Sequence, residues 1–505
     1  MRSLWRAETG FFLVLTAILI VGGRSRLFRD PGTFWHIVTG QRILQAREFL
    51  HADPYSCTFF GQRWVPYEWL GECVMAGLYA VGGFDTLLWA SAVILAALYT
   101  WIAHRLLAVG LHGLMVTGVI LLTLATSTSH FHVRPHIVSI IFLALTFAWL
   151  NDYEARRIDW RRLWWLVPLF VVWTNIHGGV LGGLGTMLLV LGGWVVYRLL
   201  GCETPGPLWG FSVLTIACGL TVFINPYGAD LPRTWIEIMR MDYLPRMIVE
   251  HAPLDPRRLD GLLVLGWGGV YLATLAGTWP RWPRITWLVP LVWLVLACER
   301  IRHAPLFAVT AALAWADLWP HTRWAAWLAR HRPDLYQVPS QPRSFPRRAL
   351  MMPVCLVALA VILQAAGIGW PILGRGWARL DPSRWPLELL PELRAYAAAR
   401  PLGTPIFNDY NHGGFLIWFT PSLRVFVDDR CEVYGNDWLR EFDDAMKHHP
   451  ERIEAWARQW GFDHALVEAG SPMDDYLRSA AAWVEVRRSE PAVLFRRREA
   501  QESVP

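Results

Sequence analysis

Short polar motifs, rich in Asp, Arg, His and Asn, interrupt the long apolar runs of this chain at a few places. The first of them, Asp-Pro-Gly-Thr-Phe-Trp-His, begins at Asp30, directly after the first apolar run. A carboxylate at a membrane surface can deprotonate an acceptor hydroxyl group beside a lipid-bound donor. The alternative, without a catalytic role, is a solvated residue that ends a helix. Asp30 is therefore a candidate general base.

Arg and His side chains recur in later motifs, where other apolar runs end. The motifs are His-Phe-His-Val-Arg-Pro-His (130–136), Asn-Ile-His-Gly-Gly (175–179) and Glu-Arg-Ile-Arg-His (299–303). Such groups are costly near hydrocarbon unless they are paired or functional. Together they could bind a phosphate or pyrophosphate group and stabilise it as it leaves. The structural alternative is snorkelling Arg and hydrogen-bonded His at helix ends. The candidates for substrate binding are Arg134, His136, His177, Arg302 and His303.

Arg302 lies between two apolar runs, residues 287–297 and 304–319, so its guanidinium group is close to the hydrocarbon boundary. A lipid phosphate arrives at the same depth and offers a bidentate partner. Glu299, one turn earlier, is an alternative internal counter-ion. The sequence leaves both interpretations open.

The elements that carry these motifs are predicted transmembrane helices, because the apolar runs are long enough to cross a hydrocarbon core about 30 Å thick. The segment 68–83 is ambiguous, since it is short for a span and could lie in the interface. If it does not span, the Arg-rich loops at 151–162, 281–284 and 320–348 become cytoplasmic, as the positive-inside rule requires. The candidate spans are then 9–28, 86–103, 113–129, 136–150, 162–175, 178–197, 208–224, 261–278, 285–298, 304–319 and 349–370.

This eleven-span interpretation places the N-terminus inside and the C-terminus outside. The polar motifs then gather on one external face, and the first external loop, 29–86, carries interface helices. One of them is predicted around 34–44, where Phe34, Ile37, Val38 and Leu44 share a face. The interpretation divides the chain into a transmembrane domain, 1–375, and an external α/β domain, 376–505.

Composition agrees with a membrane protein. Of the 505 residues, 54% are hydrophobic and 17% are charged, a charged share too low for a soluble chain of this length. The net charge of +6 is explained by cytoplasmic Arg rather than by nucleic-acid binding. After about residue 380 the composition is that of a soluble domain, with strands predicted at 405–408, 424–428, 464–467 and 492–495. There, Asp428, Asp429 and Arg430 could bind a metal, but a solvated strand end is favoured.

In their order along the chain, these motifs resemble those of the GT-C superfamily of polytopic glycosyltransferases. The resemblance is to a bacterial branch whose first loop reads D-P-x-x-x-W-H, here Asp30, Pro31, Trp35 and His36. It continues through Glu68-Trp-Leu, Arg134-Pro-His and Asn175-Ile-His-Gly-Gly, and in the soluble part through Val427-Asp-Asp-Arg. The implied fold is a polytopic α-helical membrane protein of about eleven transmembrane helices with a small C-terminal α/β soluble domain.

The resemblance implies a hexosyl or pentosyl transferase of the bacterial inner membrane, with a polyprenyl-phosphate sugar donor and its soluble domain outside the cytoplasm. The acceptor would be a glycan, lipid or protein. Asp30 and Glu68 are the implied catalytic residues, and His36 joins the substrate-binding candidates. Many GT-C enzymes carry two neighbouring acids; here Pro31 and Gly32 follow Asp30, so a divalent metal is possible but no cofactor is certain. The alternatives are a lipid or solute transporter or flippase and a non-catalytic assembly protein.

Overall fold

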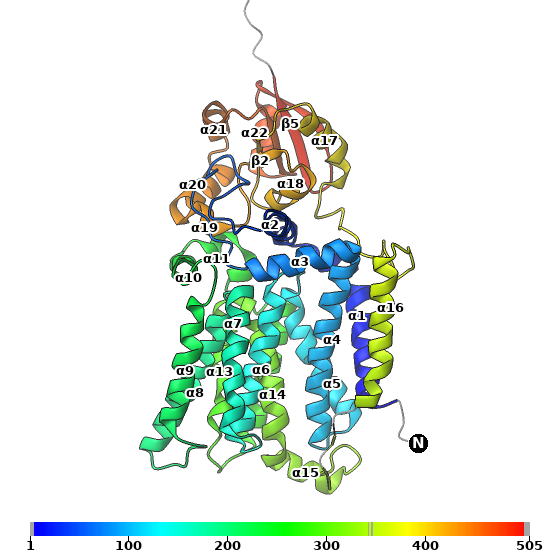
Figure 1. Ribbon diagram of the computed structural model, residues 1–505, viewed down its shortest axis with the longest axis vertical. Coiled ribbons are helices and arrows are strands. Elements are labelled where there is room, and N and C mark those ends of the chain that lie inside the picture. The colour runs from blue at the N-terminus through cyan, green and yellow to red at the C-terminus, as the bar shows by residue number, and fades with distance from the viewer. Residues whose placement is uncertain (1–4, 342, 345–346, 499–505) are drawn as a thin grey trace, which may run out of the picture.

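The computed structural model describes residues 5–341, 343–344 and 347–498. The outermost residues of the two predicted domains, 1–4 and 499–505, and three residues of the predicted loop 320–348 lie outside this described part. A bundle of long helices carries a mixed α/β domain on one of its ends (Figure 1). The first loop and the C-terminal domain meet at that end, and α15 (Arg323–His331) lies at the other end.

Each predicted span overlaps one helix of the bundle. The apolar side chains of these helices pack against one another inside the bundle or lie on its outer surface. Seven of them are long and apolar enough to cross a membrane by length and composition. The bundle helices are α1 (Ala7–Arg26), α4 (Phe84–Ala108), α5 (Gly113–Ser127), α6 (His136–Glu154), α7 (Leu166–Ile176), α8 (Val180–Leu199), α9 (Leu208–Leu220), α12 (Leu259–Ala276), α13 (Ile285–Glu299), α14 (Ala304–Leu318) and α16 (Met351–Ala365).

The ambiguous segment 68–83 forms α3 (Trp69–Gly82), which lies across the end of the bundle and not within it (Figure 1). Helix α2 (Gly32–Ala46) crosses α3 in close contact, since a Cβ atom at Gly40 would lie 2.0 Å from the carbonyl oxygen of Glu72. Only glycine permits this approach. The two helices of the first loop therefore form a platform on the bundle, and 68–83 adds no further helix to it.

The remaining short elements lie at the two ends of the bundle and position its loops. On the same end as α2 and α3 are α10 (Asp230–Arg240) and α11 (Leu244–Met247). The described 3-10 turns are Thr128–His130, Trp160–Trp165, Thr221–Phe223, Val249–His251, Ile301–His303, Trp319–His321, Arg347–Leu350 and Leu387–Leu389.

The C-terminal domain is built on a five-stranded sheet of order β2-β1-β3-β5-β4. Strand β1 pairs in parallel with β2 and β3, and β5 pairs antiparallel with β3 and β4. The strands are β1 (Thr404–Asn408), β2 (Leu423–Val425), β3 (His464–Glu468), β4 (Trp483–Arg488) and β5 (Ala492–Arg497). The helices are α17 (Leu390–Ala398), α18 (Gly413–Phe419), α19 (Cys431–Tyr434), α20 (Asn436–Lys447), α21 (Arg452–Trp460) and α22 (Pro472–Ser479).

Part of the apolar face predicted around 34–44 meets the C-terminal domain: Phe34 and Val38 pack with it, whereas Ile37 packs in the bundle core and Leu44 is 52% exposed. Phe34 is fully buried, and its ring packs edge-on against Trp385 and Phe415 at centroid distances of 5.0 and 6.2 Å. A Cβ atom at Gly414 would lie 2.2 Å from the carbonyl oxygen of Pro31, so α18 begins directly against the loop that carries Asp30. The domain thus rests on the platform next to the first motif.

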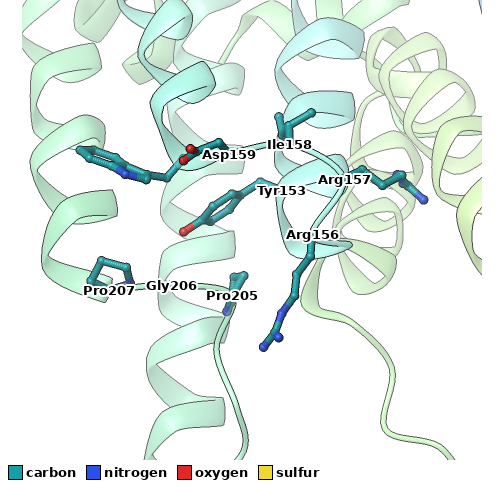
Figure 2. A pocket seen from close by; sticks show the side chains of 9 residues that line it. Tyr153, Arg156, Arg157, Ile158, Asp159, Pro205, Gly206 and Pro207 are labelled. Atoms are coloured by element: carbon teal, nitrogen blue, oxygen red, sulfur yellow. The ribbon is translucent and has the colours of Figure 1, made fainter.

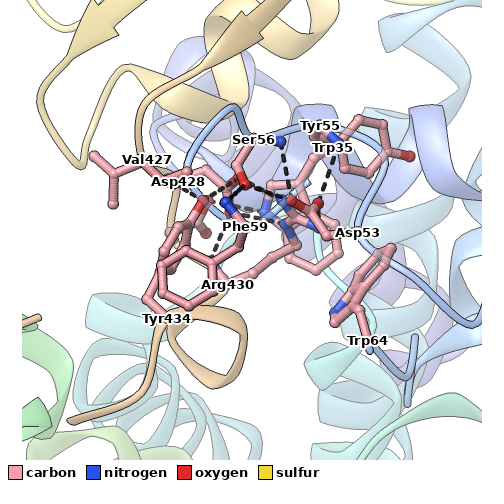
Figure 3. Close-up of polar contacts among 12 residues, drawn as sticks. Trp35, Asp53, Tyr55, Ser56, Phe59, Trp64, Val427, Asp428, Arg430 and Tyr434 are labelled. Atoms are coloured by element: carbon pink, nitrogen blue, oxygen red, sulfur yellow. Dashed lines mark hydrogen bonds and ion pairs between the residues drawn. The ribbon is translucent and has the colours of Figure 1, made fainter. Parts of the chain in front are cut away.

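A buried ionic cluster fastens the same contact (Figure 3). Arg430 forms a bidentate pair with Asp428, at 2.6 and 2.8 Å, and reaches Asp53 of the first loop at 2.8 Å. All three side chains are 0% exposed. The prediction of a solvated strand end at 428–430 is therefore wrong, because the partner of Arg430 comes from a loop that is distant in the sequence.

Candidate active site

Asp30 stands in the short link between α1 and α2, under the C-terminal domain. Its carboxylate pairs with Arg134 at 3.1 Å and accepts the backbone N–H of Gly32 at 2.7 Å. The two side chains are 11% and 24% exposed, so both are reachable from outside the core. The predicted base and the predicted phosphate ligand of the second motif therefore lie side by side, as an ionised pair.

Glu68 lies deeper, in front of α3, between two imidazole rings. Its Oε2 atom is 3.4 Å from Nε2 of His36, and its Oε1 atom is 3.5 Å from Nε2 of His177. The side chain is 3% exposed. Burial raises the pKa of Glu68 to about 8, although nearby Arg134 lowers it. Glu68 is thus a carboxylic acid at neutral pH, next to the Asp30 carboxylate.

A second carboxylate, Glu250, meets the histidines of the 130–136 motif. Its Oε1 atom is 3.3 Å from Nδ1 of His130 and 3.2 Å from Nε2 of His132. Burial lowers the pKa of His132, but the hydrogen bond to Glu250 and the charge of Asp30 outweigh it, so the net shift is upward. His136 turns away, with Nε2 on the carbonyl oxygen of His130 at 2.7 Å.

Asp30, His132 and Glu250 could hold a metal ion, since one ligand atom of each lies within 4.8 Å of the others. The set fits a divalent cation: it offers two carboxylates and one imidazole, and Nδ1 of His132 is buried with no hydrogen-bond partner in the described part of the chain. Such an ion would compete with Arg134 for Asp30. Sequence reasoning missed Glu250, because its loop carries no apolar periodicity and no recognisable ligand spacing.

Arg302 lies in the turn between α13 and α14 and contacts Nε2 of His251. Within the described ranges no carboxylate forms an ion pair with it, so the predicted alternative partner Glu299 does not neutralise it. Burial lowers the pKa of Arg302, and the charge of Glu250 is the strongest influence that counteracts this. His303 directs Nδ1 to the carbonyl oxygen of Leu296 at 3.0 Å and so also closes a helix end.

The C-terminal domain supplies an acid near Asp30, where the sequence directly after Asp30 has none. Trp35 donates its indole N–H to Asp429 at 2.8 Å. Burial raises the pKa of Asp429 to about 8, and the nearby Asp30 carboxylate adds to this shift. The sequence alone predicts for Asp429 only a metal ligand or a solvated residue at a strand end. Its place beside Asp30 depends on domain docking, which no local pattern encodes.

A pocket of about 420 Å³ opens at the opposite end of the bundle, around Tyr153 and Asp159 (Figure 2). The two Arg side chains that line it form ion pairs within the protein. Arg157 binds Asp152 at 2.7 Å and also pairs with Asp317, and Arg156 pairs with Glu203 at 3.1 Å. This pocket brings none of the predicted site residues together, so the chemistry is to be sought under the C-terminal domain.

The residues at that end can perform an acid–base displacement on an anionic substrate. Asp30 provides a carboxylate, Arg134 and Arg302 provide positive charge, and Glu68 provides a proton. Two carboxyl groups whose environments separate their proton affinities are the usual basis of paired acid and base roles. The arrangement needs a substrate with a leaving group that gathers negative charge.

No protein-family model and no curated protein sequence matches the chain. Among solved structures, ArnT from Cupriavidus metallidurans in the apo state has a TM-score of 0.51 at 15% identity, over 97% of this chain and 98% of that chain. ArnT from the same organism bound to undecaprenyl phosphate has a TM-score of 0.49 at 14% identity, over 96% and 97%. The Archaeoglobus fulgidus oligosaccharyltransferase tethered with an acceptor peptide has a TM-score of 0.49 at 12% identity, over 91% and 69%.

The likeness to apo ArnT extends over nearly the whole of both chains, so it concerns the bundle and the C-terminal domain together. It confirms the fold class predicted from the motifs, a multi-pass helical membrane protein with a small C-terminal α/β domain. This chain therefore shares the fold of ArnT from Cupriavidus metallidurans over nearly its whole length.

Proposed function

We propose that the protein transfers a sugar from a polyprenyl-phosphate donor to an acceptor at the extracytoplasmic face of the bacterial inner membrane. The observation that carries the proposal is the cluster under the C-terminal domain, in which a reachable carboxylate, Asp30, lies beside Arg134 at 3.1 Å. The sidedness follows from the Arg-rich loops, which lie at the other end of the bundle. The sugar is a hexose or pentose, and the acceptor is a glycan, lipid or protein.

In this proposal the donor phosphate enters from the bilayer and meets Arg134 and Arg302. Arg302 has no carboxylate partner among the described residues, so a phosphate group is the anion that would satisfy its planar donors. His36, His136, His177 and His303 lie near one or both of these guanidinium groups, whose charges act on each imidazole ring. The phosphate becomes more negative as the anomeric bond breaks, and fixed positive charge stabilises it at that moment.

Asp30 takes the acceptor proton. The acceptor oxygen attacks the anomeric carbon through an oxocarbenium-like transition state, and its hydroxyl proton moves to the Asp30 carboxylate. Asp30, His132 and Glu250 are the residues that would hold a divalent cation, which when bound supplies further positive charge near the phosphate. The acceptor must approach between the platform and the C-terminal domain, because Asp30 lies there.

Turnover of labelled polyprenyl-phosphate hexoses and pentoses by the full chain in proteoliposomes tests the proposal. We expect transfer by the wild type and a loss of about 10²–10⁴-fold in Asp30→Asn, which keeps the shape of the side chain but removes the base. Asp437→Asn is the matched control, since Asp437 is 98% exposed on the C-terminal domain. Full turnover in Asp30→Asn would refute the assignment of the base. Solute or lipid movement without transfer would favour a transporter.

A further inference from the structure

Glu68 is held in an unfinished hydrogen-bonding arrangement. Among the residues that the structure describes, the Nε2 atom of His36 and the Oε2 atom of Glu68 are both buried without a hydrogen-bond partner, and they face each other at 3.4 Å. On the other side, Nε2 of His177 faces Oε1 at 3.5 Å. A buried polar group without a partner is destabilising. Each carboxyl oxygen therefore has one imidazole nitrogen slightly too far away for a full hydrogen bond.

The hydrogen-bond network assigns the proton of each ring. The backbone N–H of Gly179 donates to Nδ1 of His177 at 2.8 Å, so this nitrogen is the acceptor and the proton is on Nε2. Nδ1 of His36 lies 3.1 Å from Oε1 of Glu72. Burial raises the pKa of Glu72 well above its ordinary value, which favours the carboxylic acid as the hydrogen-bond donor to Nδ1.

Both rings are neutral, because burial lowers the pKa of His36 and of His177 well below the ordinary value. Each ring consequently directs an N–H group at a different oxygen of Glu68. A protonated carboxyl group gains little from two such N–H donors. A carboxylate gains more, because hydrogen bonds to a charged acceptor are shorter and about twice as strong as neutral ones. The surroundings of Glu68 are thus prepared for the loss of its proton.

Several elements bring charged or titratable groups close to Glu68. These groups are His36 and Glu72 from the platform, Tyr67 beside it, His177 before α8, Asp30 and Arg134 near the ends of α1 and α6, Arg302 before α14, and Glu432 from α19. Arg134 and Arg302 both act on the charge of Glu68, so a phosphate bound between these two guanidinium groups lies beside the acid.

We propose that Glu68 is the general acid that protonates the departing lipid phosphate, and that His36 and His177 are positioning residues that stabilise the resulting carboxylate. The inference rests on the proposed function. The bond between the anomeric carbon and the phosphate oxygen breaks, and its electron pair stays with the phosphate. The proton of Glu68 goes to a phosphate oxygen, the hydroxyl proton of the acceptor goes to Asp30, and the new carbon–oxygen bond forms. Solvent later restores the proton of Glu68 and removes that of Asp30.

Binding of undecaprenyl phosphate to the purified full chain, measured between pH 7 and 9.5, tests the acid without knowledge of the sugar. We expect the wild-type Kd to weaken by about tenfold for each pH unit above about 8, because the phosphate then meets a carboxylate. Glu68→Gln, a neutral isostere, should remove this dependence, and Glu68→Asp should restore one. His36→Phe should move it to higher pH, since the carboxylate loses a donor; a merely structural role would leave it in place.

Asp429 also has a pKa of about 8, so Asp429→Asn decides between the two acids. The inference is overturned if the pH dependence persists in Glu68→Gln or disappears in Asp429→Asn. Turnover separates it from the proposed function. Loss of transfer in Asp30→Asn with full transfer in Glu68→Gln refutes only the acid. Absence of transfer by the wild type refutes the proposed function as well.

Discussion

Arg430 is the residue whose loss should most disturb the contact between the first loop and the C-terminal domain. Its guanidinium group is fully buried and pairs with Asp428 at 2.6 Å and Asp53 at 2.8 Å. It also lies over the rings of Tyr55 and Trp64, at 4.8 and 4.5 Å from their centroids. Arg430→Ala would leave two buried carboxylates without their counter-ion, a change that costs about 3–5 kcal/mol.

Hydrogen exchange measured by mass spectrometry reports this contact directly. The amide of Cys57 donates to the carbonyl of Val425 at 2.8 Å, and the amide of Val425 donates to the carbonyl of Tyr55 at 3.1 Å. These bonds join the first loop to the edge of the sheet. A loss of about 3–5 kcal/mol corresponds to roughly 10²–10⁴-fold faster exchange of peptides that cover 53–59 and 423–428, if exchange proceeds through separation of the two parts.

Two further variants show whether the cause is the uncompensated charge. Arg452→Ala removes an Arg that is 40% exposed and lies 3.6 Å or more from its partners, so exchange should change by less than about fivefold. Adding Asp53→Asn and Asp428→Asn to Arg430→Ala should recover part of the protection. If Arg430→Ala alone accelerates exchange by less than about threefold, the buried cluster does not hold the domain on the platform.

Three other expectations concern the site. Because the pKa of Glu68 is raised from 4.5 to about 8, its ionisation opposes folding; it should lower stability by up to about 1.4 kcal/mol per pH unit between about pH 4.5 and 8, and Glu68→Gln should reduce the slope in thermal unfolding scans by this amount, which leaves the contribution of Asp429. Arg302→Lys should unfold like the wild type but bind undecaprenyl phosphate about tenfold more weakly, because an ammonium group lacks the planar donor pair; unchanged affinity would make Arg302 structural. Gly414→Ala should speed exchange around residues 29–35, since its Cβ would lie 2.2 Å from the carbonyl oxygen of Pro31, whereas Gly10→Ala, with no neighbour within 4 Å, should not.

The bundle could be predicted from the sequence because its signal is local. Most of the apolar runs have the length of a span, and the Arg-rich loops lie at one end of the bundle. The platform helix α3 was ambiguous for the same reason, since its short apolar run fits a span or an interface helix equally well. The glycine contact between Gly40 and Glu72, which fixes it across the bundle, is a tertiary feature.

The candidate site was only partly predictable. Asp30 and Arg134 were named from motifs and lie together, and the same motifs led to His36, Glu68 and His177. The sequence could not predict that Asp30 pairs with Arg134 while Glu68 is buried between His36 and His177, because this arrangement depends on which loops meet above the bundle.

Contributions from distant segments escaped sequence reasoning. Glu250 and His251 occur in an irregular loop whose pattern resembles any solvated segment. Asp429 belongs to a motif that is typical of an exposed strand end, and it becomes buried only when the C-terminal domain docks on Trp35. The strand β4 was missed because most of its side chains are exposed and polar, so it lacks the apolar alternation of the other strands.

The position of a bound lipid phosphate tests the central claim most directly. A cryo-electron microscopy structure of the full chain with undecaprenyl phosphate should place the phosphate density within about 3–4 Å of the guanidinium groups of Arg134 and Arg302, next to Asp30 and Glu68 and under the C-terminal domain. Density for the phosphate at the opposite end of the bundle, near Arg156 and Tyr153, would contradict the proposed site and the reaction that depends on it.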